Sequence, residues 1–161
     1  MQKKEQIEKI NKFLDEVICK ELINLEKADT SIVDFVILGQ TIEVLGALLD
    51  KKPMKAKGQS MKRFDRSVRY LFGGRYRVLN VNNILYDKLR NQMTHTFIPS
   101  GDILLIKNNK DNDYRNLEFR DGTLVLVASQ FTQDIIHACK RLKSLLIDGK
   151  IEPKNISYDN E

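Results

Sequence analysis

Cysteine and histidine are scarce in this chain: it has two of each and no tryptophan among 161 residues. Cys19 and Cys139 both fall at helical spacing among apolar neighbours, so we interpret them as reduced, buried thiols that act as small hydrophobic residues. Two cysteines and two histidines without ligand-like spacing argue against a structural zinc site. We therefore expect neither a metal nor a cofactor.

Long apolar runs are also missing. No uninterrupted apolar run reaches the roughly 18 residues of a membrane-spanning helix, so none is expected. The first residues, Met1-Gln2-Lys3-Lys4-Glu5, lead into mixed charge and not into an apolar run, unlike a secretory signal. The expectation is a cytoplasmic protein without a membrane partner.

The composition fits one globular domain. Apolar residues make up 42% of the chain, which is enough to bury a core, and charged residues make up 30%. No internal repeat, low-complexity tract or long linker divides the sequence. We expect a single helical domain over residues 1–150 and a flexible tail over 151–161.

Helical periodicity accounts for most of the chain. It predicts helices over 5–25, 32–50, 59–72, from 80 or 82 to 96, and 129–148. The second of these is apolar nearly all round, which is typical of a central buried helix. Gly39 and Gly46 lie seven residues apart on one face of it, where they permit close approach of a neighbouring helix or of a second subunit. Glu43, the lone charge in this run, either reaches the surface at the rim or pairs with a cation inside.

Short β-prone segments precede the last helix. Residues 103–106 read as a strand, and 117–120 and 123–127 read as a hairpin around Asp121-Gly122, a pair that suits a type I′ turn. The sequence therefore predicts a mainly α fold, a helical bundle of about five helices with a small antiparallel hairpin or sheet before the last helix.

Positive charge is concentrated in one part of the chain, whose net charge is +5. Between residues 51 and 77 only Asp65 opposes ten basic residues. This asymmetry favours a polyanionic partner such as RNA, although a solvated basic face without a ligand has the same pattern. The candidate nucleic-acid-binding residues, three of them on one face of the helix 59–72, are Lys62, Arg66, Arg69, Arg75 and Arg77.

A polar run near the end of the fourth predicted helix carries the one chemically suggestive constellation. Asn91 and His95 are four residues apart and share a helix face, and the long side chain of Arg90 can curl toward that face. An imidazole can transfer protons near neutral pH, and a guanidinium can bind phosphate oxygens and stabilise added negative charge. These residue types suit cleavage of RNA without a metal ion.

Such a reaction needs two proton transfers, which one histidine does not easily provide. A second histidine from a dimer mate would help to provide them. The alternatives are a helix-terminal His95 that packs or interacts with the helix dipole, and a solvated Arg90. The other histidine, His137, is interpreted as a packing or surface residue of the last helix.

The run Leu89-Arg90-Asn91-Gln92-Met93-Thr94-His95 resembles the signature of the HEPN superfamily (higher eukaryotes and prokaryotes nucleotide-binding), an Arg, usually a polar residue, a short spacer and a His on a late bundle helix. The wider layout of residues 32–145 is also similar to a group of uncharacterised bacterial HEPN-like proteins. Its matching parts include Arg63-Phe64 and Leu85-Tyr86, and the segment Gly122-x-Leu124-Val125-Leu126 before the last helix.

The resemblance implies a helical bundle that forms a homodimer with two Arg–His pairs facing one cleft. It implies a metal-independent endoribonuclease of phage defence, toxin–antitoxin or RNA-processing systems, with a protein regulator or antitoxin as a further partner. In such an enzyme His95 would transfer protons, Arg90 would bind the phosphate, and Asn91 would be the polar residue that orients these two side chains. The superfamily also includes inactive members, so the alternative is a non-catalytic domain that binds a protein partner or nucleic acid.

Overall fold

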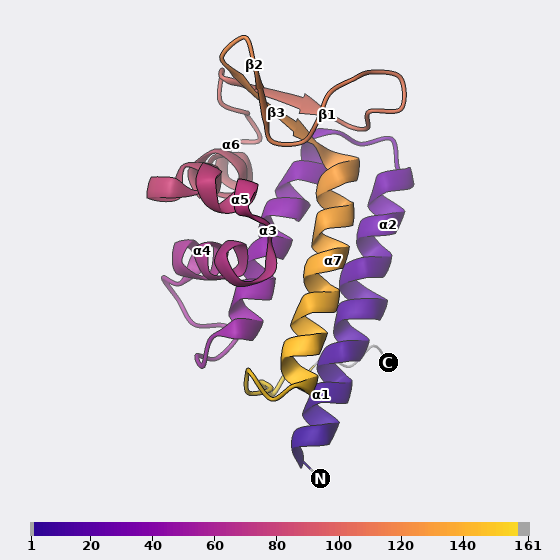
Figure 1. Cartoon of the computed structure of the whole chain (residues 1–161), viewed down its shortest axis with the longest axis vertical. Helices are drawn as coiled ribbons and strands as arrows, with labels where there is room; N and C mark the ends of the chain where they lie inside the picture. Colours follow the sequence, from indigo (N-terminus) through magenta and orange to yellow (C-terminus); the bar gives the residue numbers. More distant parts are fainter. Residues whose placement is uncertain (1, 158–161) are drawn as a thin grey trace.

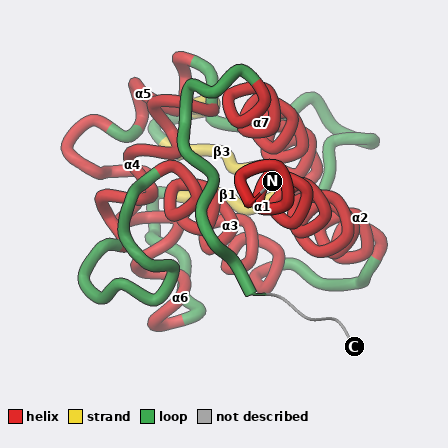
Figure 2. The backbone as a smooth tube through the Cα atoms, turned by 90° about the horizontal axis from the view of Figure 1, so that it is seen from below, coloured by secondary structure: helices red, strands yellow, loops and turns green. Residues whose placement is uncertain are grey.

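The chain begins with one continuous helical rod that packs along the last helix. In the computed structural model, which describes residues 2–157, the rod consists of α1 (Gln2–Lys12), the π-helical stretch η1 (Phe13–Cys19) and α2 (Lys20–Lys27). Its apolar stripe, with Ile10, Leu14 and Leu22 buried, faces α7 (Ala128–Ile147). Figures 1 and 2 show the rod and α7 side by side, running in opposite directions. The predicted first and last helices are confirmed.

The helix α3 (Ile32–Leu49) occupies the centre, as its all-round apolar sequence predicts. It packs against α4 (Ser60–Leu71), α7 and η3 (Tyr86–Asn91), and Figure 1 shows it behind α7. The length of α3 and its mean hydropathy of 1.9 would also fit a membrane span, but just over half of it (56%) is buried inside the protein. That packing is typical of the core helix of a bundle.

The two glycines of α3 bring neighbouring segments of the same chain close to it. A Cβ at Gly46 would overlap the backbone carbonyl of Arg63 in α4. A Cβ at Gly39 would lie 3.2 Å from the Cα of Arg90 in η3. Of the two alternatives that the sequence left open, a neighbouring helix therefore explains both glycines.

The segment between α4 and the sheet departs from the expected single helix. A short helix, α5 (Gly74–Leu79), follows α4 directly, in a stretch for which no helix was predicted. The 3-10 turn η2 (Val81–Asn83) has left-handed backbone at Asn82 and Asn83, with φ of 54° and 60°, so the chain kinks there. The helical segment resumes before η3, continues as α6 (Gln92–Thr96), and ends where Phe97 adopts φ of 55°.

The small sheet has the order β1-β3-β2. Its strands are β1 (Ile103–Ile106), β2 (Glu118–Arg120) and β3 (Thr123–Val127). The hairpin of β2 and β3 is antiparallel, and positive φ at Asp121 and Gly122 suits the expected type I′ turn. However, β1 pairs with β3 in parallel, so the expectation of a purely antiparallel sheet is wrong. The overall class, mainly α with a small sheet before the last helix, is confirmed.

Part of the expected flexible tail is packed. Beyond Gly149, which ends α7 with φ of 68°, the chain crosses the lower end of the bundle (Figure 2). Ile156 is buried there, and the Lys154 ammonium donates to Asp50 Oδ1 at 2.8 Å. Residues 151–157 therefore belong to the folded domain, whereas 158–161, the remainder of the predicted tail, lie outside the described residues.

Candidate functional site

The Arg90–His95 run spans the junction of two helix types. Arg90 and Asn91 are the last residues of the π-helical η3, and His95 lies in the α-helical turn that follows. Leu89 and Met93 are buried and fix this segment against the core, and the rings of Phe64 and Tyr86 meet edge-on at 5.5 Å to join it to α4. A π-helical turn within a helix is frequent at functional sites.

Arg90 is turned inward, toward α3. Its Nε donates to Glu43 Oε2 at 2.6 Å, and the two side chains are only 12% and 13% exposed. Glu43 also accepts a hydrogen bond from Ser60 Oγ at 2.9 Å, at the start of α4. The carboxylate thus ties three elements together, and of the two alternatives for Glu43 the internal ion pair is confirmed.

The remaining guanidinium nitrogens of Arg90 have no such partner. Across residues 2–157, neither terminal nitrogen makes a hydrogen bond, and neither belongs to the fully buried polar atoms without a partner. Neither nitrogen is therefore fully buried. A single bond through Nε fixes the plane of the guanidinium and leaves its outer edge for an anionic ligand.

His95 is solvent-exposed and Asn91 is half-buried. Neither side chain forms a hydrogen bond with another described residue, and no bond joins His95 to Arg90. The hydroxyl of Thr94, between them in sequence, is buried without a partner in the described part of the chain. Arg90 thus contacts Glu43, and the imidazole of His95 faces solvent. Within one chain, Arg90 and His95 do not form a preformed pair.

The candidate nucleic-acid-binding residues are all exposed, but they are not equivalent. Arg69 donates to Asp65 Oδ2 at 2.7 Å, which neutralises it. The other four have no ion-pair partner within residues 2–157: Lys62, Arg66, Arg75 and Arg77. These four form the unpaired basic residues of α4 and α5.

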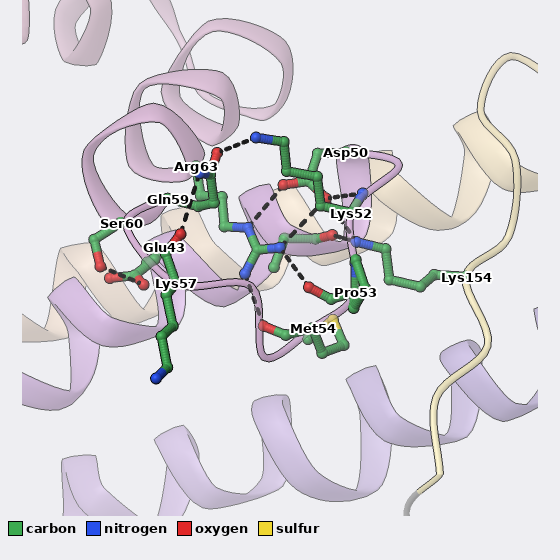
Figure 3. Close-up of polar contacts among 11 residues, drawn as sticks. Glu43, Asp50, Lys52, Pro53, Met54, Lys57, Gln59, Ser60, Arg63 and Lys154 are labelled. Carbon is green, nitrogen blue, oxygen red and sulfur yellow. Dashed lines mark hydrogen bonds and ion pairs between the residues drawn. The ribbon is translucent and has the colours of Figure 1, made fainter.

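Arg63, by contrast, is buried, and Figure 3 shows the polar groups that surround its guanidinium. Its guanidinium donates to Asp50 Oδ2 at 2.7 Å and to the carbonyls of Pro53 and Met54, both at 2.8 Å. Burial alone would raise the pKa of Asp50, but hydrogen bonds from Arg63 and Lys154 outweigh it and hold that pKa below its ordinary value. These hydrogen bonds hold the lysine-rich loop that follows α3 against α4. No sequence pattern had indicated this cluster as a site.

A cleft of about 620 Å³ lies on another face, between the start of α5, the loop before β2 and α7. Its floor is Tyr76, whose hydroxyl donates to Asp134 at 2.5 Å and accepts from Asn116 at 3.2 Å. Burial, and then the Asp134 carboxylate, raise the pKa of Tyr76 well above its ordinary value. His137 and Arg75 line this cleft, and His137 is exposed, so of its two interpretations, a packing or a surface residue, the second is confirmed.

Within residues 2–157, no group of three or more His, Cys, Asp or Glu side chains is placed to hold a metal ion. The motif offers an arginine oriented by a nearly buried carboxylate and an exposed imidazole on the same helical segment, and the unpaired basic residues lie on α4 and α5. No family model, curated protein or solved structure matches this chain.

Proposed function

We propose that this protein is a metal-independent endoribonuclease of HEPN type that acts as a homodimer. The observation that carries the proposal is the state of Arg90: Glu43 holds it through Nε, and its terminal nitrogens have no hydrogen-bond partner within residues 2–157. The same helical segment exposes His95. A guanidinium fixed in this way is preorganised to bind a phosphate, because little freedom remains to be lost when the ligand arrives.

The proposed reaction is an attack of a ribose 2′-hydroxyl on the adjacent phosphorus. One imidazole takes the 2′ proton, the P–O5′ bond breaks, and a second imidazole gives a proton to the departing 5′ oxygen. The products are a 2′,3′-cyclic phosphate and a 5′-hydroxyl. Arg90 would stabilise the charge that develops on the phosphate oxygens, and Asn91 would orient the reacting groups.

Two copies are required because one chain offers one imidazole at this place. Large apolar side chains next to the motif support an interface there: Phe97 and Ile98, which follow α6, are 54% and 65% exposed. Exposed aromatic and aliphatic residues of this size are typical of a contact surface. We propose that pairing through this segment brings the two His95 rings to one cleft.

The experiment is cleavage of a mixed RNA pool in EDTA by the wild type, His95→Ala and His137→Ala. His137 is the matched control, since it is the other exposed histidine and lies on the cleft floored by Tyr76. We expect loss of cleavage by about 100-fold or more in His95→Ala only, the scale of a lost proton-transfer group. Equal cleavage by wild type and His95→Ala would overturn the proposal.

A second candidate is a non-catalytic domain that binds nucleic acid or a protein partner. The observation that favours it is the near-burial of the Arg90–Glu43 pair, since a neutralised arginine attracts a phosphate less strongly. Salt-sensitive RNA binding without cleavage, equal in the wild type and His95→Ala, would support this alternative.

A further inference from the structure

The chain's two cysteines, far apart in sequence, meet between its first and last helical elements. Cys19 is the last residue of η1 and is half-buried, and Cys139 lies in the buried stripe of α7. Figures 1 and 2 show the two elements side by side and antiparallel. The pair belongs to neither the motif helix nor the cleft beside His137.

The register of the two helical elements places the thiols opposite each other. Asp15 of η1 forms an ion pair with Lys143 of α7. Cys19 follows Asp15 by four residues and Cys139 precedes Lys143 by four, so in an antiparallel pair they lie one turn away at a common level. In agreement with this register, each thiol shifts the pKa of the other, as close neighbours do.

The surroundings make the two thiols unequal. The hydrogen bond from Cys139 lowers the pKa of Cys19 to about 7 against the opposing effects of burial and Asp15, with help from Lys143 and Lys140. The pKa of Cys139 is raised, by its hydrogen bond to Cys19 and by burial. The lowered pKa favours the thiolate form of Cys19 over that of Cys139, and the thiolate is the form that attacks oxidants.

We propose that Cys19 and Cys139 form a redox-active dithiol, which a peroxide oxidises to a disulfide that joins the N-terminal rod to the last helix. The Cys19 thiolate attacks one peroxide oxygen, the O–O bond breaks, and with one proton a sulfenic acid and one water form. The Cys139 sulfur then attacks the sulfenic sulfur, and its proton and the hydroxyl leave as a second water. Two thiols and one hydrogen peroxide thus give one disulfide and two waters.

The disulfide would alter the stability of the domain. It would close a loop that contains α3, the motif helix and the sheet, and such a cross-link reduces the entropy of the unfolded chain. The thermal midpoint is therefore expected to rise on oxidation and to return on reduction. This inference does not depend on the proposed ribonuclease activity.

The test is titration of the full chain with stoichiometric hydrogen peroxide at pH 7, followed by intact mass and by peptide mapping without reductant. We expect a monomer lighter by two hydrogen atoms, in which the peptides of Cys19 and Cys139 are linked, and which dithiothreitol restores. Unreacted thiols, oxygenated cysteines without a linkage, or a disulfide between two chains would overturn the proposal.

Two variants test which cysteine attacks the peroxide and which one then forms the disulfide. Cys139→Ala removes the thiol that lowers the pKa of Cys19, so Cys19 should react with peroxide more slowly than in the wild type. The sulfenic acid that forms has no second thiol to condense with, so it should accumulate and react with dimedone. In Cys19→Ser the buried Cys139 should stay reduced for at least ten times longer than the wild-type pair. Faster or equal oxidation of Cys139 in that variant would contradict the assigned order of attack, and circular dichroism of each variant shows whether it is folded.

Discussion

Nε of Arg90 lies 2.6 Å from Oε2 of Glu43, and this nearly buried ion pair joins the motif helix to the central helix of the bundle. The pair has two consequences. It orients a guanidinium that would otherwise sample many rotamers, and it places a charge on each side of a tightly packed helix contact. The stability of the domain and the chemistry of the motif therefore depend on the same carboxylate.

Replacing Glu43 by Gln should destabilise the domain by about 3–5 kcal/mol, because the nearly buried Arg90 would lose its counter-charge. Urea unfolding at pH 7 measures the change. Glu8→Gln is the matched control, since Glu8 is exposed on α1 without an ion pair in the described chain, and it should change the free energy of unfolding by less than about 0.5 kcal/mol. An equal effect of the two substitutions would contradict a structural role for the pair.

The glycines of α3 allow a graded test of the helix packing. Gly46→Ala should be more destabilising than the roughly 1–3 kcal/mol of ordinary overpacking, because its Cβ would overlap the Arg63 carbonyl. Gly39→Ala should have a smaller effect, since its nearest atom is 3.2 Å away. Gly101→Ala, which meets no atom within 4 Å, is the control for thermal unfolding. If Gly46→Ala were as stable as Gly101→Ala, the close contact of α3 and α4 would be wrong.

Asp50 gives a pH dependence of stability. Its pKa is lowered in the folded state, so its contribution is fully present above the ordinary aspartate pKa of about 4 and is lost as pH falls through the lower folded value. Asp50→Asn should therefore be most destabilising at neutral pH, where Arg63 and Lys154 lose their counter-charge. Urea unfolding from pH 7 to pH 3 should show the two proteins converging in acid, and a constant difference over that range would contradict the assignment.

The unpaired basic residues of α4 and α5 should govern RNA affinity. Changing all four (Lys62, Arg66, Arg75 and Arg77) to Gln should weaken binding and reduce the slope of log affinity against log salt, by about 0.7 for each lost phosphate contact with single-stranded RNA. Fluorescence anisotropy at several salt concentrations measures both. The control changes four exposed lysines elsewhere to Gln: Lys4, Lys20, Lys27 and Lys110. Equal losses in the two variants would show that only net charge matters.

Periodicity predicted the long helices because each has a stripe or surface that must be buried, and the strands and turn because Asp121-Gly122 favours one turn geometry. It failed where the backbone leaves the 3.6-residue repeat. A regular helix from 80 or 82 to 96 would place Val81 and Ile84 on the buried face with Leu85 and Leu89, yet they are 56% and 45% exposed. The kink at Asn82 and Asn83 and the π-helical turn of η3 rotate the side chains away from the positions that a regular helix would give them.

The arrangement of the candidate site could be predicted only in part, because it depends on tertiary packing. The motif was located on the correct helical segment, and the exposure of His95 follows from its position near the end of that segment. The partner of Arg90 could not be deduced, because Glu43 is 47 residues away and meets it only through the packing of η3 on Gly39 of α3. The parallel pairing of β1 with β3 is likewise a property of the tertiary fold, since the sequence shows only that both are β-prone.

The proposed role of His95 in RNA cleavage without a metal ion is tested best by analysing the RNA ends that are produced in EDTA. We expect 2′,3′-cyclic phosphate and 5′-hydroxyl ends from the wild type and from His137→Ala, and no cleavage above background from His95→Ala. Cleavage by His95→Ala at the wild-type rate, ends carrying a 5′-phosphate, or no cleavage of any RNA by the wild type would contradict it.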